Sequence, residues 1–542
     1  MPIDDESRPE KKKRRSRWRW IVGIALGLVL ALGIALAYAV SHAEPILRAR
    51  VIETLSIRFK SKVELSGFHV SINHGVQVAG ENLRIYGDSD PNIHQPGVQA
   101  LISIAEFQFG MPMWNLLKTP MHVRTVYVKG LALNIPPKQH RQQMNRLRTK
   151  AAKAKIFVDH FVFDNAMLVI NTSNPDKLPL VFDIETLDLK ATAPGQPLRF
   201  VANLVNPKPV GIIHSTGLIG PWQADSPRDT PVKGQYSFSN ADLSTIRGLG
   251  GTLSSTGDYV GTLDNIAVDG RTDTPDFSVS SSGHPMPLRT EFHAIVDGTS
   301  GDTFLRPVKA RILHSVLVAE GFVVREKEPA RRRVKLDVSI LEGRIEDLLR
   351  LGIRTDPPLM TGAVRLKTKF DLPPADLDIT DRLKLSGNFQ VSGAHFTNDK
   401  WQAKIDSLSL RSQGKPKLAK DHIPDNVPSD LNGTFQLNHG LLSFRSLHFE
   451  VPGMEVNMTG KYSLDGKEFD FHGKARMQAT ISHMVTGWKA ILLKPVDPFF
   501  KKHGAGTELP VKITGTKSEP HFGLDFGHKS SPVEARQTPF GR

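Results

Sequence analysis

The residue types and spacings that catalysis needs are scarce in this chain. Its 542 residues include no cysteine, which excludes a thiol nucleophile and a cysteine-ligated zinc site. The sequence has no G-x-S-x-G, H-E-x-x-H, phosphate-loop or dinucleotide-binding pattern. We therefore expect no catalytic residues, no metal and no cofactor. The alternative is a hydrolase whose carboxylates meet only in the folded chain.

Two other groups of polar residues have a weak chemical signature. The histidines beyond residue 430 lack metal-ligand spacing; they are His439, His448, His472, His483, His503, His521 and His528. The acidic pairs at residues 88–90 and 376–378 could hold a cation, but such pairs in proline-containing loops are usually plain turns. Neither group predicts a site.

The sequence instead favours noncovalent binding of apolar groups. Apolar and polar residues alternate in residues 383–391 and 431–437, which places the apolar side chains on one face of each strand. The alternation continues to residue 471 and returns at 511–513. The apolar side chains of this pattern, which would line a lipid groove if the sheet curls and its face stays open, are Leu383, Leu385, Phe389, Phe435, Leu437, Leu442, Phe444, Phe449, Val451, Val456, Met458, Tyr462, Phe469, Phe471, Val511 and Ile513.

Turn residues separate these strands. Residues 438–440 (Asn-His-Gly), 452–453 (Pro-Gly) and 465–466 (Asp-Gly) stand where an antiparallel meander must reverse. The predicted fold is mainly β, with a long, curled antiparallel sheet that is groove-like or sandwich-like. A β-sandwich core has the same alternation, and periodicity alone favours the sandwich over a groove.

Strands are also predicted along most of the chain before residue 383. They cover residues 63–72, with a bulge at Gly67, and then 76–85, 122–135, 156–170, 180–189 and 198–204. Helices are predicted at residues 44–62, 241–249, 341–351 and 479–493, the last closing the end of the sheet.

A membrane anchor is predicted at residues 20–40, which carry no Asp, Glu, Lys or Arg. Twenty-one helical residues span about 31 Å, close to the thickness of the hydrocarbon layer. Eight basic residues precede the segment and favour a cytoplasmic N-terminus, and Trp18, Trp20 and Tyr38 suit the headgroup level. A cleaved signal peptide is the alternative, because small residues precede positions 40 and 44.

The remaining divisions follow composition. We expect a basic cytoplasmic tail (1–19), the anchor (20–40), an N-terminal helix with strands (41–135) and a basic linker (136–153). A middle β-rich region (154–356), a C-terminal β region with a closing helix (357–526) and a disordered tail (527–542) complete the chain. The net charge of +15 suits an anionic membrane surface, and we expect no nucleic acid partner.

Several short segments resemble AsmA-family envelope proteins, which are related to TamB-like bridging proteins. In the N-terminal part the resemblance lies in the anchor, the helix that begins at 44–47 and the strand at 63–65. In the C-terminal part it lies at 359–362, 381–387, 449–453, 511–516 and 522–523. It covers about residues 20–135 and 357–526.

The resemblance implies a protein of the inner membrane, crossing it once, with a periplasmic body. It also implies an apolar β-groove involved in phospholipid transport or outer-envelope homeostasis, with phospholipid and the inner membrane as partners and an outer-envelope protein as a possible one. About thirty strands at about 4.8 Å would extend roughly 145 Å. The alternatives are a scaffold that binds protein partners through loops such as 136–153, and the hydrolase.

Overall fold

The computed structural model describes the β-rich part of the chain. The described residues are 62–72, 75–86, 100–112, 121–135, 156–170, 180–191, 196–221, 223, 227–298, 300–326, 332–375, 377–420, 426–464, 469–486, 494, 506–516 and 520–525, with short stretches between 27 and 56.

The described residues are mainly β, as predicted. They contain 25 strands that are assigned to one open sheet, and every strand pair given by register is antiparallel. A β-sandwich needs two sheets packed face to face. Because all the described strands belong to one sheet, they do not form a sandwich of two separate sheets.

The chain divides into two compact units, and unit 1 comprises residues 1–169 and 186–194. Its strands are β1 (Val63–Glu64), β2 (Gly67–Ile72), β3 (Val76–Ile85), β4 (Ile102–Met111), β5 (Met121–Ile135) and nearly all of β6 (Ile156–Ile170), while β7 (Leu180–Ala191) is shared between the units. The described residues between 44 and 56 are helical, and Val51, Ile52 and Leu55 pack against the buried core of these strands. The predicted capping helix is thus confirmed where it is described.

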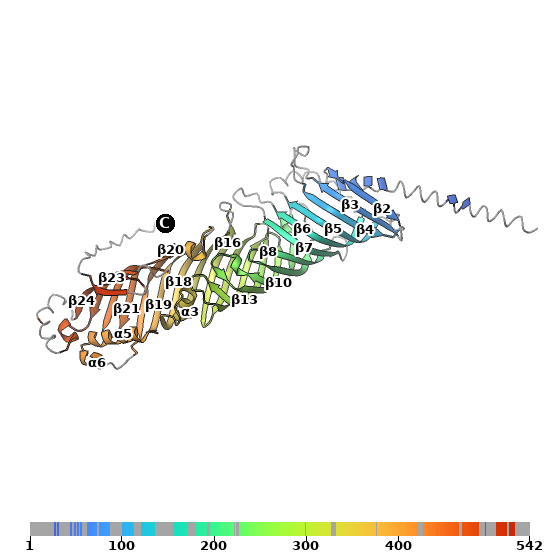
Figure 1. Cartoon of the computed structure of the whole chain (residues 1–542). Helices are drawn as coiled ribbons and strands as arrows, with labels where there is room; N and C mark the ends of the chain where they lie inside the picture. Colours follow the sequence, from blue (N-terminus) through green and yellow to red (C-terminus); the bar gives the residue numbers. More distant parts are fainter. Residues whose placement is uncertain are drawn as a thin grey trace, which may run out of the picture. The chain divides into compact units, whose positions relative to one another are not determined.

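Unit 2 comprises residues 170–185 and 195–542. Its strands are β8 (Leu198–Pro207), β9 (Val210–Ile219), β10 (Pro231–Asp242), β11 (Leu249–Gly250), β12 (Thr252–Thr262), β13 (Asn265–Val279), β14 (Met286–Asp297), β15 (Asp302–Ile312), β16 (Ser315–Arg325), β17 (Arg332–Arg344), β18 (Met360–Leu372), β19 (Lys384–Phe396), β20 (Ser429–Asn438), β21 (Leu441–Val451), β22 (Met454–Ser463), β23 (Phe469–Met477), β24 (Thr507–Gly515) and β25 (Pro520–Leu524). Apart from the short β11, each strand pairs with the next along the chain (Figure 1).

The helices of unit 2 are short and differ from those predicted. They are η3 (Pro227–Asp229), η4 (Leu243–Thr245), α3 (Ile345–Gly352), α4 (Ile379–Arg382), α5 (Asp399–Ser412), α6 (Pro416–Lys420) and η5 (Ile481–Met484). The helix predicted at 241–249 is wrong, because β10 runs to Asp242, whose side chain caps the single turn η4, and β11 follows. The helix predicted at 341–351 begins only at Ile345, because β17 continues to Arg344.

Helix α5 was not predicted, and its buried residues explain why. Four of its five buried side chains are polar, namely Gln402, Asp406, Ser409 and Ser412, whereas Trp401 and Leu408 are exposed. Such a helix lacks the apolar stripe by which amphipathic helices are recognised.

The predicted closing helix at 479–493 and the predicted anchor have different outcomes. Residues 481–484 form one turn of 3-10 helix, so the predicted α-helix is wrong there, and residues 487–493 lie outside the described residues.

Nearly all of the predicted anchor, with Trp18, Trp20 and Tyr38, also lies outside the described residues. No helix among the residues that the structure describes is long and apolar enough to cross a membrane. The anchor therefore stays a prediction.

Candidate functional site

Cross-strand register places the predicted groove residues on one face of unit 2. Following paired residues from β19 to β24 gives four rows, which run Leu385–Leu437–Leu442–Tyr462–Phe469, Phe435–Phe444–(Gly460)–Phe471–Ile513, Phe389–(Gly433)–Leu447–Met458–(Gly473)–Val511 and Val391–Leu431–Phe449–Val456–Ala475–Leu509. Val451 lies one row further, beside Met454. Leu383 is the exception, because it caps α4 before β19 begins, and its N–H bonds to the carbonyl of Ile379.

One β-bulge keeps these rows on a single face. In β21 the alternation changes phase between Phe444 and Leu447, and the register shifts at the same place, where Thr434 pairs with Ser446 but Phe435 pairs with Phe444. Arg445 is the extra residue. A bulge changes the phase without moving apolar side chains to the opposite face.

The centre of this face is an aromatic cluster. The ring centroids of Phe389 and Phe435 lie 6.1 Å apart, those of Phe389 and Phe444 6.1 Å, and those of Phe444 and Phe471 5.7 Å. These distances are within the range in which aromatic pairs attract. Phe471 is buried, but the other three rings are only half-buried, although they stand in the interior of the sheet.

One border of the face is closed by α5. Ile405 of this helix packs with Val451, Val456 and Met477, which are all buried. Ser409 donates a 2.7 Å hydrogen bond to the carbonyl of Pro452, in the turn between β21 and β22. The predicted residues Val451 and Val456 therefore belong to a packed border, and Met458 and Val511 of the neighbouring row pack against the same cluster.

The same face continues by register into strands that the sequence did not single out. From β18 back to β8, apolar residues and glycines meet each other across every pair; examples are Leu366–Ile340–Leu317 and Ala294–Val268–Tyr259. Aromatic rings lie over the glycines paired with them. A Cβ on Gly217 would come within 3.0 Å of the ring of Phe200, and one on Gly270 within 2.6 Å of Phe292.

Polar side chains interrupt the apolar face between β9 and β14. The Tyr259 hydroxyl lies 2.7 Å from the Ser215 hydroxyl, and the Tyr236 hydroxyl lies 3.0 Å from that of Ser255. Burial raises the pKa of both tyrosines, so they remain neutral donors near neutral pH. Only the strand register shows that these residues face inward, which is why the sequence did not predict them.

Helix α3 closes the border of the face over β18 and β19. Ile345 and Leu348 pack on the buried Val364, Val391 and Ala394.

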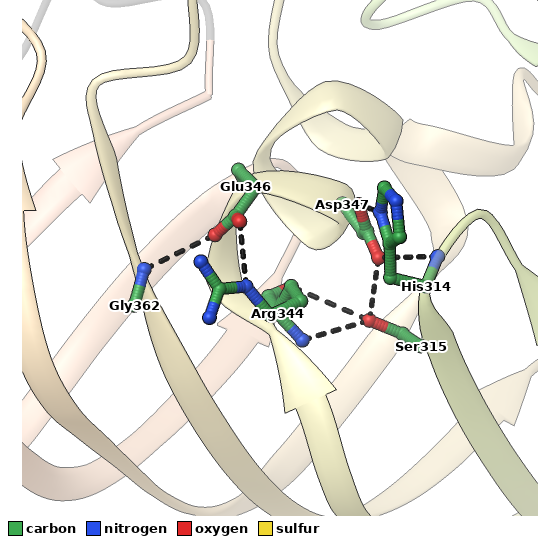
Figure 2. Close-up of polar contacts among 6 residues, drawn as sticks. All are labelled: His314, Ser315, Arg344, Glu346, Asp347 and Gly362. Carbon is green, nitrogen blue, oxygen red and sulfur yellow. Dashed lines mark hydrogen bonds and ion pairs between the residues drawn. The ribbon is translucent and has the colours of Figure 1, made fainter.

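Two carboxylates clamp the start of this helix, as Figure 2 shows. Asp347 accepts hydrogen bonds from the Ser315 hydroxyl at 2.8 Å and from the backbone N–H of His314 at 3.0 Å. Glu346 accepts from Arg344 Nε at 2.7 Å and from the backbone N–H of Gly362 at 3.1 Å. Burial opposes ionisation of Glu346, but the hydrogen bonds it accepts lower its pKa.

This cluster contains serine, histidine and aspartate but not in a catalytic arrangement. The buried Ser315 hydroxyl points at Asp347, while the imidazole of His314 is 78% exposed and its Nδ1 is 3.5 Å from the carboxylate. A nucleophilic serine needs a histidine that takes its proton. The three residues are better explained as the attachment of α3.

A third contact joins parts of unit 2 that are far apart in sequence. Asp378, in the connection between β18 and β19, accepts hydrogen bonds from the Ser280 hydroxyl at 3.0 Å to each carboxylate oxygen. The N–H of Ile379 bonds to the carbonyl of Arg247 at 3.2 Å. Burial opposes ionisation of Asp378, but bonds from Thr380 and Ser280 lower its pKa. The other residue of this acidic pair, Asp376, lies outside the described residues.

Comparison with family models, curated proteins and solved structures gives no match. The resemblance to AsmA-family proteins therefore stays a prediction, and the function is argued from the geometry alone.

Proposed function

We propose that the chain is a membrane-anchored envelope protein whose curled sheet forms an apolar trough for the acyl chains of phospholipids. The observation that carries the proposal is the one-sided face of unit 2, which register follows from β8 to β24 and which is apolar except for the polar side chains between β9 and β14. All the described strands belong to one sheet, so no second sheet covers this face within the described part of the chain.

Curling of the sheet is supported by the contact between Asp378 and Ser280. Register connects Asp371, at the end of β18, to Ala267 of β13 through Lys335, Phe322, Phe304 and Ile295. Ser280 lies thirteen residues beyond Ala267 in sequence, which is about 43 Å along a strand. Five strand spacings add about 24 Å sideways, so a flat sheet would separate the two ends by about 49 Å.

The chain available between them is much shorter. Seven residues separate Asp371 from Asp378, and they span at most about 25 Å. The two edges can therefore meet only if the sheet curls between β13 and β18.

The apolar face lies on the inner side of this curl. Along β19 the side chains of Lys384, Ser386, Asn388 and Gln390 are exposed, whereas the apolar residues between them are half-buried or buried. In a single sheet, one face is more exposed to solvent than the other when the sheet curls, and the less exposed face is the concave one.

Such a trough can bind lipid without covalent chemistry. Each methylene that is buried contributes about 0.8 kcal/mol to the free energy of binding. An acyl chain that packs on the half-buried rings is therefore bound by removal of apolar surface from water. The proposed membrane anchor would tether the chain to a membrane that contains phospholipid. Localisation in the inner membrane, with the body in the periplasm, belongs to the same proposal.

The test uses the full-length chain and vesicles of phosphatidylethanolamine and phosphatidylglycerol. After incubation and re-isolation, the bound phospholipid is quantified by mass spectrometry. Phe435→Glu is compared with Gln436→Glu, because these neighbours on β20 point to opposite faces. We expect Phe435→Glu, like Phe444→Glu, Met458→Glu and Phe471→Glu, to reduce bound lipid at least tenfold, and Gln436→Glu to leave it unchanged.

Circular dichroism checks that each variant remains folded. Lipid-free wild-type protein would overturn the proposal. Equal lipid binding by Phe435→Glu and Gln436→Glu, with both folded, would place the lipid elsewhere. A stoichiometric protein partner in place of lipid would favour the scaffold alternative.

A further inference from the structure

The connection between β18 and β19 reaches across the sheet from one edge to the other. β18 ends and β19 begins at the pair Asp371–Lys384, on one edge of the sheet. Ser280 follows the end of β13 and Arg247 follows the end of β10, and register places both strand ends on the opposite edge. One bifurcated hydrogen bond from the Ser280 hydroxyl to the Asp378 carboxylate and one backbone bond to Arg247 hold the tip of the connection there. We call residues 373–375 and 377–383 of this connection the clasp.

The clasp is held by few contacts and is built around one residue. The Asp378 carboxylate caps α4 through the N–H of Thr380 at 3.0 Å and binds Ser280 at the same time. Gly248 leaves room for it, since a Cβ there would come within 2.5 Å of an Asp378 oxygen. Leu377, at the tip, is 52% exposed, so no apolar side chain at that position seals the contact.

We propose that the clasp is a gate over the trough, which a phospholipid must open to pass along it. The inference rests on the proposed function. Acyl chains can lie on the concave face, but a charged headgroup must stay in water because burying it unpaired is costly. It therefore projects through the opening between the two edges of the sheet. The clasp joins those edges, so a closed clasp blocks the headgroup while the chains beneath it are unobstructed.

The geometry also explains why opening is feasible. Hydrogen bonds to a charged group each contribute about 1.5–3 kcal/mol, and the Ser280 hydroxyl donates a bond of this kind to Asp378. No disulfide joins the clasp to Ser280 or Gly248, because the chain has no cysteine. A gate needs a contact of this size, strong enough to close and weak enough to break in each passage.

The absence of cysteine makes the test clean. In the full-length chain, Ser280→Cys and Asp378→Cys are joined by a short thiol-to-thiol cross-linker to lock the clasp. Photo-reactive amino acids replace Leu204 on β8 in one sample and Phe435 on β20 in another; both positions are half-buried on the apolar face, on opposite sides of the clasp in strand order. The probe is a vesicle phospholipid with a clickable acyl chain.

With the clasp unlinked, we expect both positions to label. With it locked, we expect one position to label as before and the other to lose at least tenfold in rate. Asp378→Ala, which removes the bonds to Ser280, should label both at least as fast as wild type. Asp381→Ala is the matched control, because Asp381 is an exposed carboxylate in the same connection.

Equal labelling of both positions in the locked and unlinked forms would overturn the gate while leaving the trough intact. No labelling at either position in any form would overturn the proposed function itself, and the gate with it.

Discussion

The attachment of α3 gives the sharpest stability prediction. Asp347 is 2% exposed and Ser315 is fully buried, so water cannot replace a lost partner. Truncation by Asp347→Ala removes the acceptor for the Ser315 hydroxyl and for the N–H of His314. Two hydrogen bonds to a charged group contribute about 3–6 kcal/mol together.

Part of that loss is recoverable. The Ser315 hydroxyl can turn to the carbonyl of Arg344, which lies 3.4 Å away. We therefore expect Asp347→Ala to destabilise the closed position of α3 by about 3 kcal/mol. Asp347→Asn keeps one acceptor oxygen without the charge and should cost about 1 kcal/mol.

Native-state hydrogen exchange of the α3 amides measures this directly. At about 1.4 kcal/mol per tenfold change, Asp347→Ala should accelerate exchange about 150-fold and Asp347→Asn about fivefold. The control is Asp356→Ala, which breaks an exposed pair with Arg350 near the other end of the helix. Such pairs contribute about 0–1 kcal/mol. If Asp347→Ala changes exchange no more than Asp356→Ala does, the buried carboxylate does not hold the helix.

Two further predictions concern the far end of unit 2. Gly460→Ala places a Cβ within 2.5 Å of the ring of Phe471, so it should lower the free energy of unfolding in urea by about 1–3 kcal/mol. Gly440→Asn is the control, because Gly440 lies at a turn with φ 71° and open space around it. This variant should lower the free energy of unfolding by less than about 1 kcal/mol. The hydrogen bond to Asp525 raises the pKa of His472, so this contact stabilises the end of β25 fully below about pH 6.5 and is lost as pH rises through the raised pKa. Hydrogen exchange at residues 520–524 should accelerate over that rise in wild type and be independent of pH, after correction for intrinsic exchange, in His472→Gln; the same pH dependence in both would refute the assignment.

Sequence patterns predicted the structure best where the burial of a residue depends on its position in its own strand. The alternation around Phe389 and Phe435 predicted both the strands and the face, since period two leaves only two faces to choose between. The bulge at Arg445 was not predicted, although the apolar positions change phase there between Phe444 and Leu447.

Patterns failed where a side chain depends on distant partners. Gln402 and Asp406 are buried because they bond to each other and to the backbone of Val427, and no local pattern marks buried polar residues of that kind. The contact between Ser280 and Asp378 joins residues 98 positions apart and exists only because of the curl we infer. The sequence marked Asp378 only as one member of an acidic pair.

The pairing of glycines with aromatic rings bears on why the apolar face stays open. Large side chains that stand upright on a sheet interdigitate with a second layer about 10 Å away, as in a sandwich. Here the ring of Phe471 lies over Gly460, and that of Phe292 lies over Gly270, so each ring covers backbone of its own sheet. Phe471 is buried in this position, whereas the half-buried ring of Phe292 keeps part of its surface for an occupant. The same residues that make a second protein layer unnecessary therefore shape a surface suited to a flexible apolar ligand.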